Sequence, residues 1–537
     1  MLPDDKRPKR VDIFVAEKII ADISTGLYRS PAAAIKELVS NAYDADATKV
    51  TITTDPPQFR TLTVEDNGSG MEIDQFLHVI SHIGGSQKRL LYDVSPNRKR
   101  KLIGRIGIGM LAVAQLGTKF FVTSSVKGQS TKFIAEVNLE PFHKDDAALM
   151  SMQKSSDKIN IGAVQYVDNI PEQPNLHYTT ITVPDAKRGL TSEITGLVKK
   201  AVGATDVVGV GDPRIKYFSD LANIVQASNR ADLTIDGYFF LLWELGLLSP
   251  VRYLANGPFD TEIRQIENLN SLNLPDLDEF SVVVDQIEIF RPQLFPNPVS
   301  SNYPSPDPKL YTLRFQDKVA GRKLTFSGYI YVQQPRIQPE ELKGVHVRIR
   351  HVGIGRYDKT WLGYPFDEGI KFGQLTGEVF VEDGLEQALN IDRDSFRETD
   401  VHFQALKGYI WEVLQRSVFP EFKSRQKDFR VLRQEHIAAL STAAFLKEVA
   451  QLPAPLTEPP TFIESKRSFL TILKTSKSSL MIERSAWHSI IREMQLSNDA
   501  QTRLLQVLTV LISSELITDV TEEEFAPLLR AIAVAVQ

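Results

Sequence analysis

The segment KELVSNAYDADA, residues 36–47, places an amide and two carboxylates at spacings that suit a helix. Glu37 and Asn41 are four residues apart, and Asp44 follows three residues later. On a helix, all three side chains would therefore project from one side. Such a group could carry chemistry. The same pattern is also typical of a solvated helix surface, so this segment leaves both interpretations open.

A second polar segment, VEDNGSGM at residues 64–71, has the pattern of a strand that ends in a glycine-rich turn. Asp66 would lie at the end of the strand, beside backbone that Gly68 and Gly70 leave accessible. There its carboxylate could accept a hydrogen bond from a buried ligand. An ordinary Asp-Asn-Gly turn uses the same residue types.

A third segment, IGRIGIGMLAVAQLG at residues 103–117, has three glycines before a run of helix formers. Gly104, Gly107 and Gly109 would leave backbone N–H groups exposed at a helix start, where the helix dipole favours an anion. No Gly-Lys-Ser/Thr follows, which excludes a Walker loop. The segment comes after two strands and lacks a suitably placed ribose-binding acid, which excludes a Rossmann fingerprint.

In this order, the three segments resemble the GHKL superfamily of ATPases, which covers gyrase B, the ninety-kilodalton heat-shock chaperones, histidine kinases and MutL. Residues 36–50 look most like MutL and MORC proteins, whereas the glycine segment and the following LGTKFFVTSS look most like the chaperones. The resemblance implies a site for ATP and Mg²⁺, in which Asn41 holds the metal and Asp66 accepts the adenine amino group. The other nucleotide-binding positions that it implies are Asp44, Gly68, Gly70, Met71, Ser86, Lys88, Gly104, Gly107, Gly109, Met110 and Thr179.

Residues of about 84–103 have the composition of a mobile lid over the nucleotide, with glycine at the start and a polar, basic sequence. Ser86 and Lys88 lie where the lids of the family place polar groups near phosphate. The basic run at residues 98–101 is interpreted as solvated charges.

The resemblance also implies the catalytic residues. Glu37 would lie close to the γ-phosphate and polarise a water molecule for attack. The segment ALNIDRDSF, residues 388–396, resembles the middle domain of the heat-shock chaperones, and its Arg393 would reach the γ-phosphate. A structural salt bridge of Arg393 to a neighbouring aspartate is the alternative. Arg336, in the loop after a predicted strand, is a second candidate for this role.

Helices and strands must position these residues. Ser30 and Pro31 predict the start of a helix, and residues 48–54 and 60–64 read as strands. Residues 324–332 and 345–350 also predict strands, the latter half-buried because apolar and polar residues alternate. The fold class is α+β: a GHKL (Bergerat-type) α/β sandwich with the lid at residues 1–188, an α/β transducer-like middle domain at 189–425, and an α-helical domain at 426–537.

The composition is that of a globular protein of 537 residues, with 42% apolar residues, a net charge of −5 and no cysteine. The absence of cysteine excludes disulfides, cysteine-bound zinc and thiol catalysis. The acidic charge disfavours a protein that coats nucleic acid through bulk charge. The first ten residues lack an apolar core, and the most apolar stretch, residues 238–251, is interrupted by a glutamate and a proline. We therefore expect a cytoplasmic protein without a signal peptide or membrane contact.

Three functional hypotheses follow from the resemblance. The first is a chaperone-like, dimeric ATPase clamp on a protein client, with the helices at residues 504–517 and 525–536 as candidates for dimerisation. Each of these helices could equally belong to the core of an ordinary helical domain. The second is a MutL- or MORC-like clamp on DNA, in genome maintenance or defence. The third is a nucleotide-binding scaffold with little hydrolysis. A sensor kinase is set aside because only about 30 residues precede the ATP-binding segment.

Overall fold

The computed structural model describes residues 2–3, 7–16, 30–81, 95, 100, 112–140, 158–186, 188–196, 206–227, 233–260, 266–277, 279–296, 306–390, 394–449, 455–463, 471–475, 479–517, 519–521, 527–528, 530–532 and 534. It has two compact units. The first comprises Met1–Pro298 and Asp307–Val418, and the second comprises Val299–Pro306 and Phe419–Gln537.

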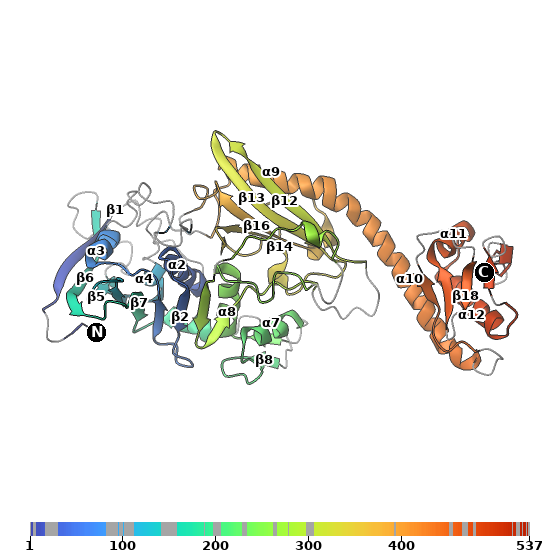
Figure 1. Ribbon diagram of the computed structural model, residues 1–537, viewed down its shortest axis with the longest axis horizontal. Coiled ribbons are helices and arrows are strands. Elements are labelled where there is room, and N and C mark those ends of the chain that lie inside the picture. Colours follow the sequence, from blue (N-terminus) through green and yellow to red (C-terminus); the bar gives the residue numbers. More distant parts are fainter. Residues whose placement is uncertain are drawn as a thin grey trace. The chain divides into compact units, whose positions relative to one another are not determined.

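The first unit contains a nine-stranded sheet with the order β1-β6-β5-β4-β7-β3-β2-β10-β11. Figure 1 labels several of these strands. The strands are β1 (Lys9–Ala16), β2 (Lys49–Thr53), β3 (Leu62–Asp66), β4 (Lys119–Ser125), β5 (Thr131–Asn138), β6 (Lys158–Pro171), β7 (Tyr178–Val183), β10 (Ser281–Val284) and β11 (Ile287–Ile289). Strands β2 and β3 confirm the two strands predicted near residues 48–64. Neighbours are antiparallel except β2 and β10, which are parallel. Residues 281–289, far along the chain, thus extend the sheet that carries Asp66.

Helices of this unit bury their apolar residues in one core with the sheet. They are α2 (Pro31–Asp44), α3 (Ile73–Ser81), α4 (Ala112–Leu116), α6 (Arg188–Thr195), α7 (Phe218–Ala227) and α8 (Gly237–Leu248). Helix α2 packs against both α4 and α8. Two short parallel strands, β8 (Asp206–Val208) and β9 (Leu233–Ile235), form a separate sheet. The predicted helix start is confirmed, because the Ser30 side chain accepts a hydrogen bond from the N–H of Ala33 at 3.2 Å.

A five-stranded sheet, in the order β12-β13-β16-β14-β15, follows in the same unit. Its strands are β12 (Lys309–Val319), β13 (Arg322–Val332), β14 (Gly344–Ile349), β15 (Val352–Gly353) and β16 (Leu375–Asp383), and helix α9 (Val401–Val413) comes next along the chain. Short segments of 3₁₀- or π-helix are η4 (Leu269–Ser271), η5 (Glu340–Leu342), η6 (Gly369–Gln374) and η7 (Leu414–Val418).

The half-buried pattern predicted for residues 345–350 is wrong, although the strand itself is confirmed. His346 and Arg348 are 0% exposed, as is Glu378 on the neighbouring strand β16. The Arg348 Nε donates to the Glu378 carboxylate at 2.6 Å, and the hydroxyls of Tyr253 and Tyr329 donate to it at 2.7 Å. The alternation of apolar and polar residues did not predict the burial of this strand, because polar side chains that are paired and hydrogen-bonded can also be buried.

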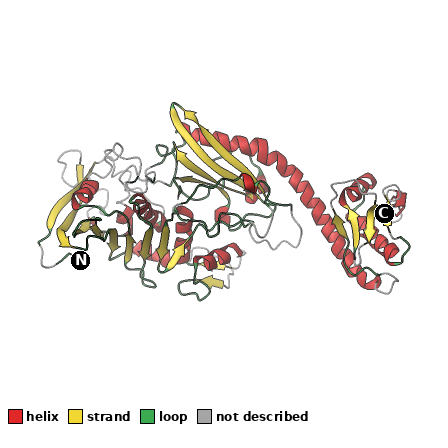
Figure 2. Cartoon of the chain, viewed as in Figure 1, coloured by secondary structure: helices red, strands yellow, loops and turns green. Residues whose placement is uncertain are grey.

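The second unit contradicts the prediction of an almost entirely helical domain at residues 426–537. Figure 2 shows strands among its helices. It contains α10 (Phe419–Val449), α11 (Arg484–Met494) and α12 (Asn498–Ser513), with strands β17 (Thr461–Ile463), β18 (Thr471–Thr475), β19 (Leu480–Glu483) and β20 (Asp519–Thr521). The strands form one sheet in the order β17-β19-β18-β20. Short apolar runs do not distinguish strands from buried helices by periodicity, and this accounts for the error.

The apolar face of α12 lies within the core of the second unit. Leu504 and Leu508 are 0% exposed and pack with Trp487 and Ile482. These leucines, part of the predicted dimerisation helix, therefore stabilise the unit itself. Of the helices that the structure describes, none combines the length and the apolar character that crossing a membrane requires.

Candidate nucleotide site

Helix α2 carries three of the predicted site residues. Glu37 is only 2% exposed, whereas Asn41 and the last helical residue, Asp44, are half-buried. The burial of Glu37 excludes the interpretation of this carboxylate as part of a solvated surface. Glu37 and Asn41 lie one helical turn apart on the same side, as the spacing predicts.

A lysine that the sequence analysis did not select lies beside Glu37. Lys36 is 0% exposed, and its Nζ is 3.5 Å from the Glu37 Oε1. The same Nζ is 3.1 Å from the Oδ1 of Asp394, which follows strand β16 in the second half of the unit. Spacing alone could not reveal this contact, because 358 residues separate Lys36 from Asp394.

Asp66 ends strand β3 and lies opposite Thr179 of strand β7 in the sheet register. Its Oδ1 accepts a hydrogen bond from the Gly68 N–H at 2.8 Å. Burial raises the pKa of the Asp66 carboxyl to about 6, although this hydrogen bond acts in the opposite direction. Asp66 and Thr179 are therefore direct neighbours across two strands of the sheet.

Ser124 of strand β4 joins the glycine-rich turn to Thr179. Its Oγ accepts a hydrogen bond from the Met71 N–H at 3.0 Å, lies 3.1 Å from the Thr179 Oγ1, and donates to the Tyr178 carbonyl at 2.9 Å. His177 supports the same turn, because its Nδ1 lies 2.7 Å from the Gly68 carbonyl oxygen. The sequence analysis missed Ser124 and His177. The available signal for Ser124 was its alternation with Phe120 and Val122, which places it on the buried face of the strand.

The turn requires glycine for steric reasons. Gly70 has a φ of +69°, and a Cβ at this position would lie 1.9 Å from the Ser125 carbonyl oxygen. A Cβ on Gly68 would lie 2.7 Å from the carbonyl oxygen of Ala45, just after α2. The Ser69 N–H donates to this same carbonyl at 2.7 Å. The turn after Asp66 is thus in direct contact with Ala45, the residue that follows the end of α2.

Part of the predicted site lies outside the described residues: Ser86, Lys88, Gly104, Gly107, Gly109, Met110 and Arg393, with most of the predicted lid. Arg336 is described and is exposed after strand β13.

The interpretation of the basic run at residues 98–101 as solvated is wrong for Arg100. Its side chain is buried, donates from Nη1 to the carbonyls of Tyr43 and Ala47 at 3.1 and 2.7 Å, and lies 4.1 Å from the centre of the Tyr43 ring. Arg100 therefore caps the C-terminal end of α2, where a cation is favourable.

Comparison with known proteins decides the nature of this domain. Residues 28–171 match the family model described as histidine kinase-, DNA gyrase B- and HSP90-like ATPase. The chain contains a GHKL ATPase domain.

The similar proteins include "DNA mismatch repair protein MutL" of Geobacillus kaustophilus, 28% identical over 130 residues, and that of Brucella anthropi, 41% identical over 68 residues. Another is "Putative type II restriction enzyme HgiDII" of Herpetosiphon aurantiacus, 36% identical over 118 residues. These matches cover 24%, 12% and 21% of this chain. They span only 20%, 11% and 18% of the relatives' own lengths, so the chain shares only a part of each relative.

The chemistry of the GHKL domain's residues suits Mg²⁺. Asn41 offers an amide oxygen, a ligand type that this ion accepts, on the half-buried side of α2. The described residues contain no group of three or more His, Cys, Asp or Glu that could hold a metal by themselves. A metal at Asn41 would thus complete its coordination with phosphate oxygens and water, as Mg²⁺ commonly does.

Proposed function

We propose that this protein binds and hydrolyses ATP with Mg²⁺ at the GHKL site, and that nucleotide-driven lid closure and dimerisation make it a clamp on a macromolecular client. The observation that carries the proposal is the position of Glu37. Its carboxylate is buried one helical turn from Asn41, and the end of the same helix contacts the turn that contains Asp66. Helix α2 therefore carries a candidate base and a candidate metal ligand, and its end contacts the turn that follows the candidate adenine acceptor.

Each residue has a distinct role in the proposed reaction. Asp66 accepts a hydrogen bond from the adenine amino group, while Gly70 and Met71 line the base pocket. Asn41 would hold Mg²⁺, and the ion would supply positive charge against the phosphates. Glu37 polarises the attacking water, and general-base assistance of this kind contributes roughly 10²–10⁴ in rate.

Arg393 is the proposed residue that stabilises the γ-phosphate in the transition state. The contact between Lys36 and Asp394 supports it over Arg336, because the residue after Arg393 lies within 3.1 Å of the lysine beside Glu37. Arg393 is therefore the immediate neighbour in the sequence of Asp394, whose carboxylate contacts helix α2. Mutation of Arg393 should reduce turnover and leave nucleotide affinity nearly unchanged.

DNA is the client that we propose, in the manner of a MutL-like clamp. The support is the names of the relatives, which are mismatch-repair proteins and a putative restriction enzyme. A chaperone-like clamp on protein is the second candidate, and it is favoured by the middle-domain segment around Arg393.

The ATPase proposal is tested by steady-state hydrolysis at several protein concentrations, with and without DNA. Specific activity that rises with concentration is expected for an active dimer. Glu37→Ala should bind ATP and lose about 100-fold or more in turnover. The matched control is Glu140→Ala, an exposed carboxylate of the same domain, which should retain activity. Unchanged turnover in Glu37→Ala would refute the role of the base.

Binding to DNA is tested separately in a gel-shift series from low to high salt. A DNA clamp should lose affinity steeply as salt rises, because phosphate contacts release counterions. Absence of a shift at low salt, together with suppression of the aggregation of an unfolded protein, would favour the chaperone-like candidate instead.

A further inference from the structure

Three polar side chains lie side by side across strands β3, β7 and β4. In the sheet register Asp66 is opposite Thr179, and Thr179 is opposite Ser124. Directly opposite residues of antiparallel strands point to the same face of a sheet. We call Asp66, Thr179 and Ser124 the polar row. The glycine-rich turn contacts this row, because the Met71 N–H donates to the Ser124 Oγ at 3.0 Å.

The direction of the hydrogen bond between the two hydroxyls follows from the other partners of Ser124. A serine hydroxyl has one proton to donate and two lone pairs that accept. The Tyr178 carbonyl, 2.9 Å from the Ser124 Oγ, can only accept, so it takes the single proton. The Met71 N–H can only donate, so it occupies one lone pair. The second lone pair is left for Thr179, whose hydroxyl therefore donates its proton to Ser124 across the 3.1 Å between the two oxygens.

This direction decides what Thr179 can offer a ligand. Its proton is held by Ser124, so its Oγ1 has only lone pairs to present on the face that it shares with Asp66. Above its pKa of about 6, the Asp66 carboxyl is ionised and also accepts only. Ser124 and Thr179 are 1% and 6% exposed, so little water can reach them to supply a proton instead. Thr179 and Asp66 thus both offer acceptors to a ligand, and neither offers a proton.

We propose that Ser124 is a positioning residue that makes the site selective for a base with an exocyclic amino group, because it holds the proton of Thr179 away from the base. This inference rests on the proposed ATP-binding function. An amino group, as in adenine, carries two N–H bonds and can donate to both acceptors. A carbonyl oxygen at the same place, as in hypoxanthine, would add a third acceptor instead. A site built to bind an N–H strongly rejects an analogue that lacks it, because its buried polar groups then stay unpaired.

The test compares the affinities for ATP and ITP, which carries a carbonyl oxygen in place of the amino group of adenine. Binding is measured by calorimetry at pH 8, where Asp66 is ionised. The wild type should prefer ATP by about 100-fold or more. In Ser124→Ala the Thr179 hydroxyl can rotate and donate to the carbonyl, so this preference should fall by about tenfold or more.

The neighbouring serine provides a matched control. Ser125 is on the same strand and is also 1% exposed, but its hydroxyl donates to the Leu176 carbonyl at 3.2 Å. Ser125→Ala therefore removes an equally buried hydroxyl without releasing the proton of Thr179. The preference for ATP over ITP should stay at the wild-type value in this variant.

A second variant separates the direction of the proton from a general support of the turn. Thr179→Val keeps the shape of the side chain and removes the hydroxyl, so it should itself lower the preference for ATP. Ser124→Ala in the Thr179→Val background should then cause no further change, because Ser124 acts through the Thr179 proton. If Ser124 only supports the turn at Met71, Ser124→Ala will weaken the binding of ATP and ITP equally, and that result would overturn the inference.

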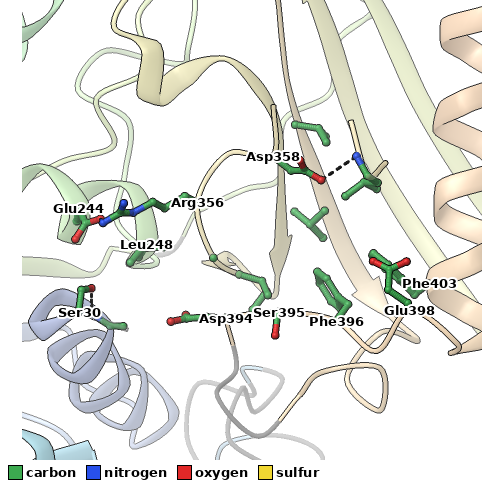
Figure 3. Close-up of a pocket in the computed structure, with 16 residues that line it drawn as sticks. Ser30, Glu244, Leu248, Arg356, Asp358, Asp394, Ser395, Phe396, Glu398 and Phe403 are labelled. Carbon is green, nitrogen blue, oxygen red and sulfur yellow. Dashed lines mark hydrogen bonds and ion pairs between the residues drawn. The ribbon is translucent and has the colours of Figure 1, made fainter. Parts of the chain in front are cut away.

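A cavity elsewhere in the same unit provides another control. Figure 3 shows this cavity, of about 500 Å³, beside Ser30 at the start of α2. Charged side chains on its walls pair within the protein, Glu244 with Arg356 and Glu398 with Lys407. Glu398→Gln should leave the preference for ATP unchanged. A change as large as that of Ser124→Ala would indicate that the base is bound in this cavity, and it would contradict the role of the polar row.

Failure of the proposed function and failure of this inference give different results. A wild type that binds neither nucleotide refutes the proposed function and the inference together. A wild type that binds ATP and ITP equally, or a Ser124→Ala variant that keeps the full preference, refutes the role of Ser124 and leaves ATP binding intact.

Discussion

The raised pKa of Asp66 makes a quantitative prediction about stability. A native pKa of about 6 against 3.8 for the ordinary carboxyl means that the folded chain binds more protons than the unfolded chain between these pH values. Stability conferred by the neutral carboxyl is therefore lost as pH rises. One pKa unit corresponds to about 1.36 kcal/mol, so ionised Asp66 destabilises the unliganded protein by at most about 3 kcal/mol at pH 7. Because the Asp66 side chain is partly exposed, water weakens this effect. We expect its ionisation to destabilise the unliganded protein by about 2 kcal/mol at pH 7 and about 1 kcal/mol at pH 5.

The perturbation that isolates this effect is Asp66→Asn, which is isosteric and retains an acceptor for the Gly68 N–H. The variant should exceed the wild type in stability, by a margin that falls by about half between pH 7 and pH 5. Urea unfolding can be followed by tryptophan fluorescence, since Trp243 is 1% exposed and belongs to the core cluster that includes Val64. Asp74→Asn, at an exposed position, serves as the control.

An equal loss of stability with pH in the wild type and in Asp66→Asn would refute the reasoning, because the pH dependence would then come from other groups. Nucleotide binding gives an independent readout. Protonated Asp66 can no longer offer both oxygens as acceptors, so the affinity of the wild type for ATP should weaken by about tenfold from pH 7 to pH 5. An affinity that is flat over this range would contradict the role of Asp66 at adenine.

Two further predictions concern packing. Gly70→Ala should lower the free energy of unfolding by more than 2 kcal/mol, because its Cβ would meet the Ser125 carbonyl at 1.9 Å in addition to the strain of positive φ. Gly128 has a φ of +88°, and a Cβ added there would have no atom within 4 Å. Gly128→Ala should therefore lose only about 1 kcal/mol of unfolding free energy in the same urea titration. Equal losses in the two variants would show that the close contact at Gly70 is unimportant. Arg348→Met leaves Glu378 buried with its charge unpaired and should destabilise the protein by about 3–5 kcal/mol by thermal or urea unfolding. A loss below 1 kcal/mol would mean that the remaining partners of Glu378, which include the two tyrosine hydroxyls and the Gln293 amide, satisfy its carboxylate.

The local features of the site could be predicted from the sequence because they depend on near neighbours. The start of α2 at Ser30, the common face of Glu37 and Asn41, and the turn after Asp66 each follow from residue type and spacing within a few positions. The glycine at position 70 is needed by a backbone conformation that few other residues adopt. These local rules also identified the ATPase domain, since the family motif consists of short segments.

The tertiary structure alone decided the contacts between distant residues. The pairing of Lys36 with Asp394, the placement of Ser124 between Met71 and Thr179, and the burial of Arg348 beside Glu378 join residues that are 30 to 358 positions apart. The free energy of such contacts depends on which elements pack together, and a local pattern carries no information on that choice. The sheet of the second unit shows the same limit, because its short strands are stabilised by their partners rather than by their own sequences.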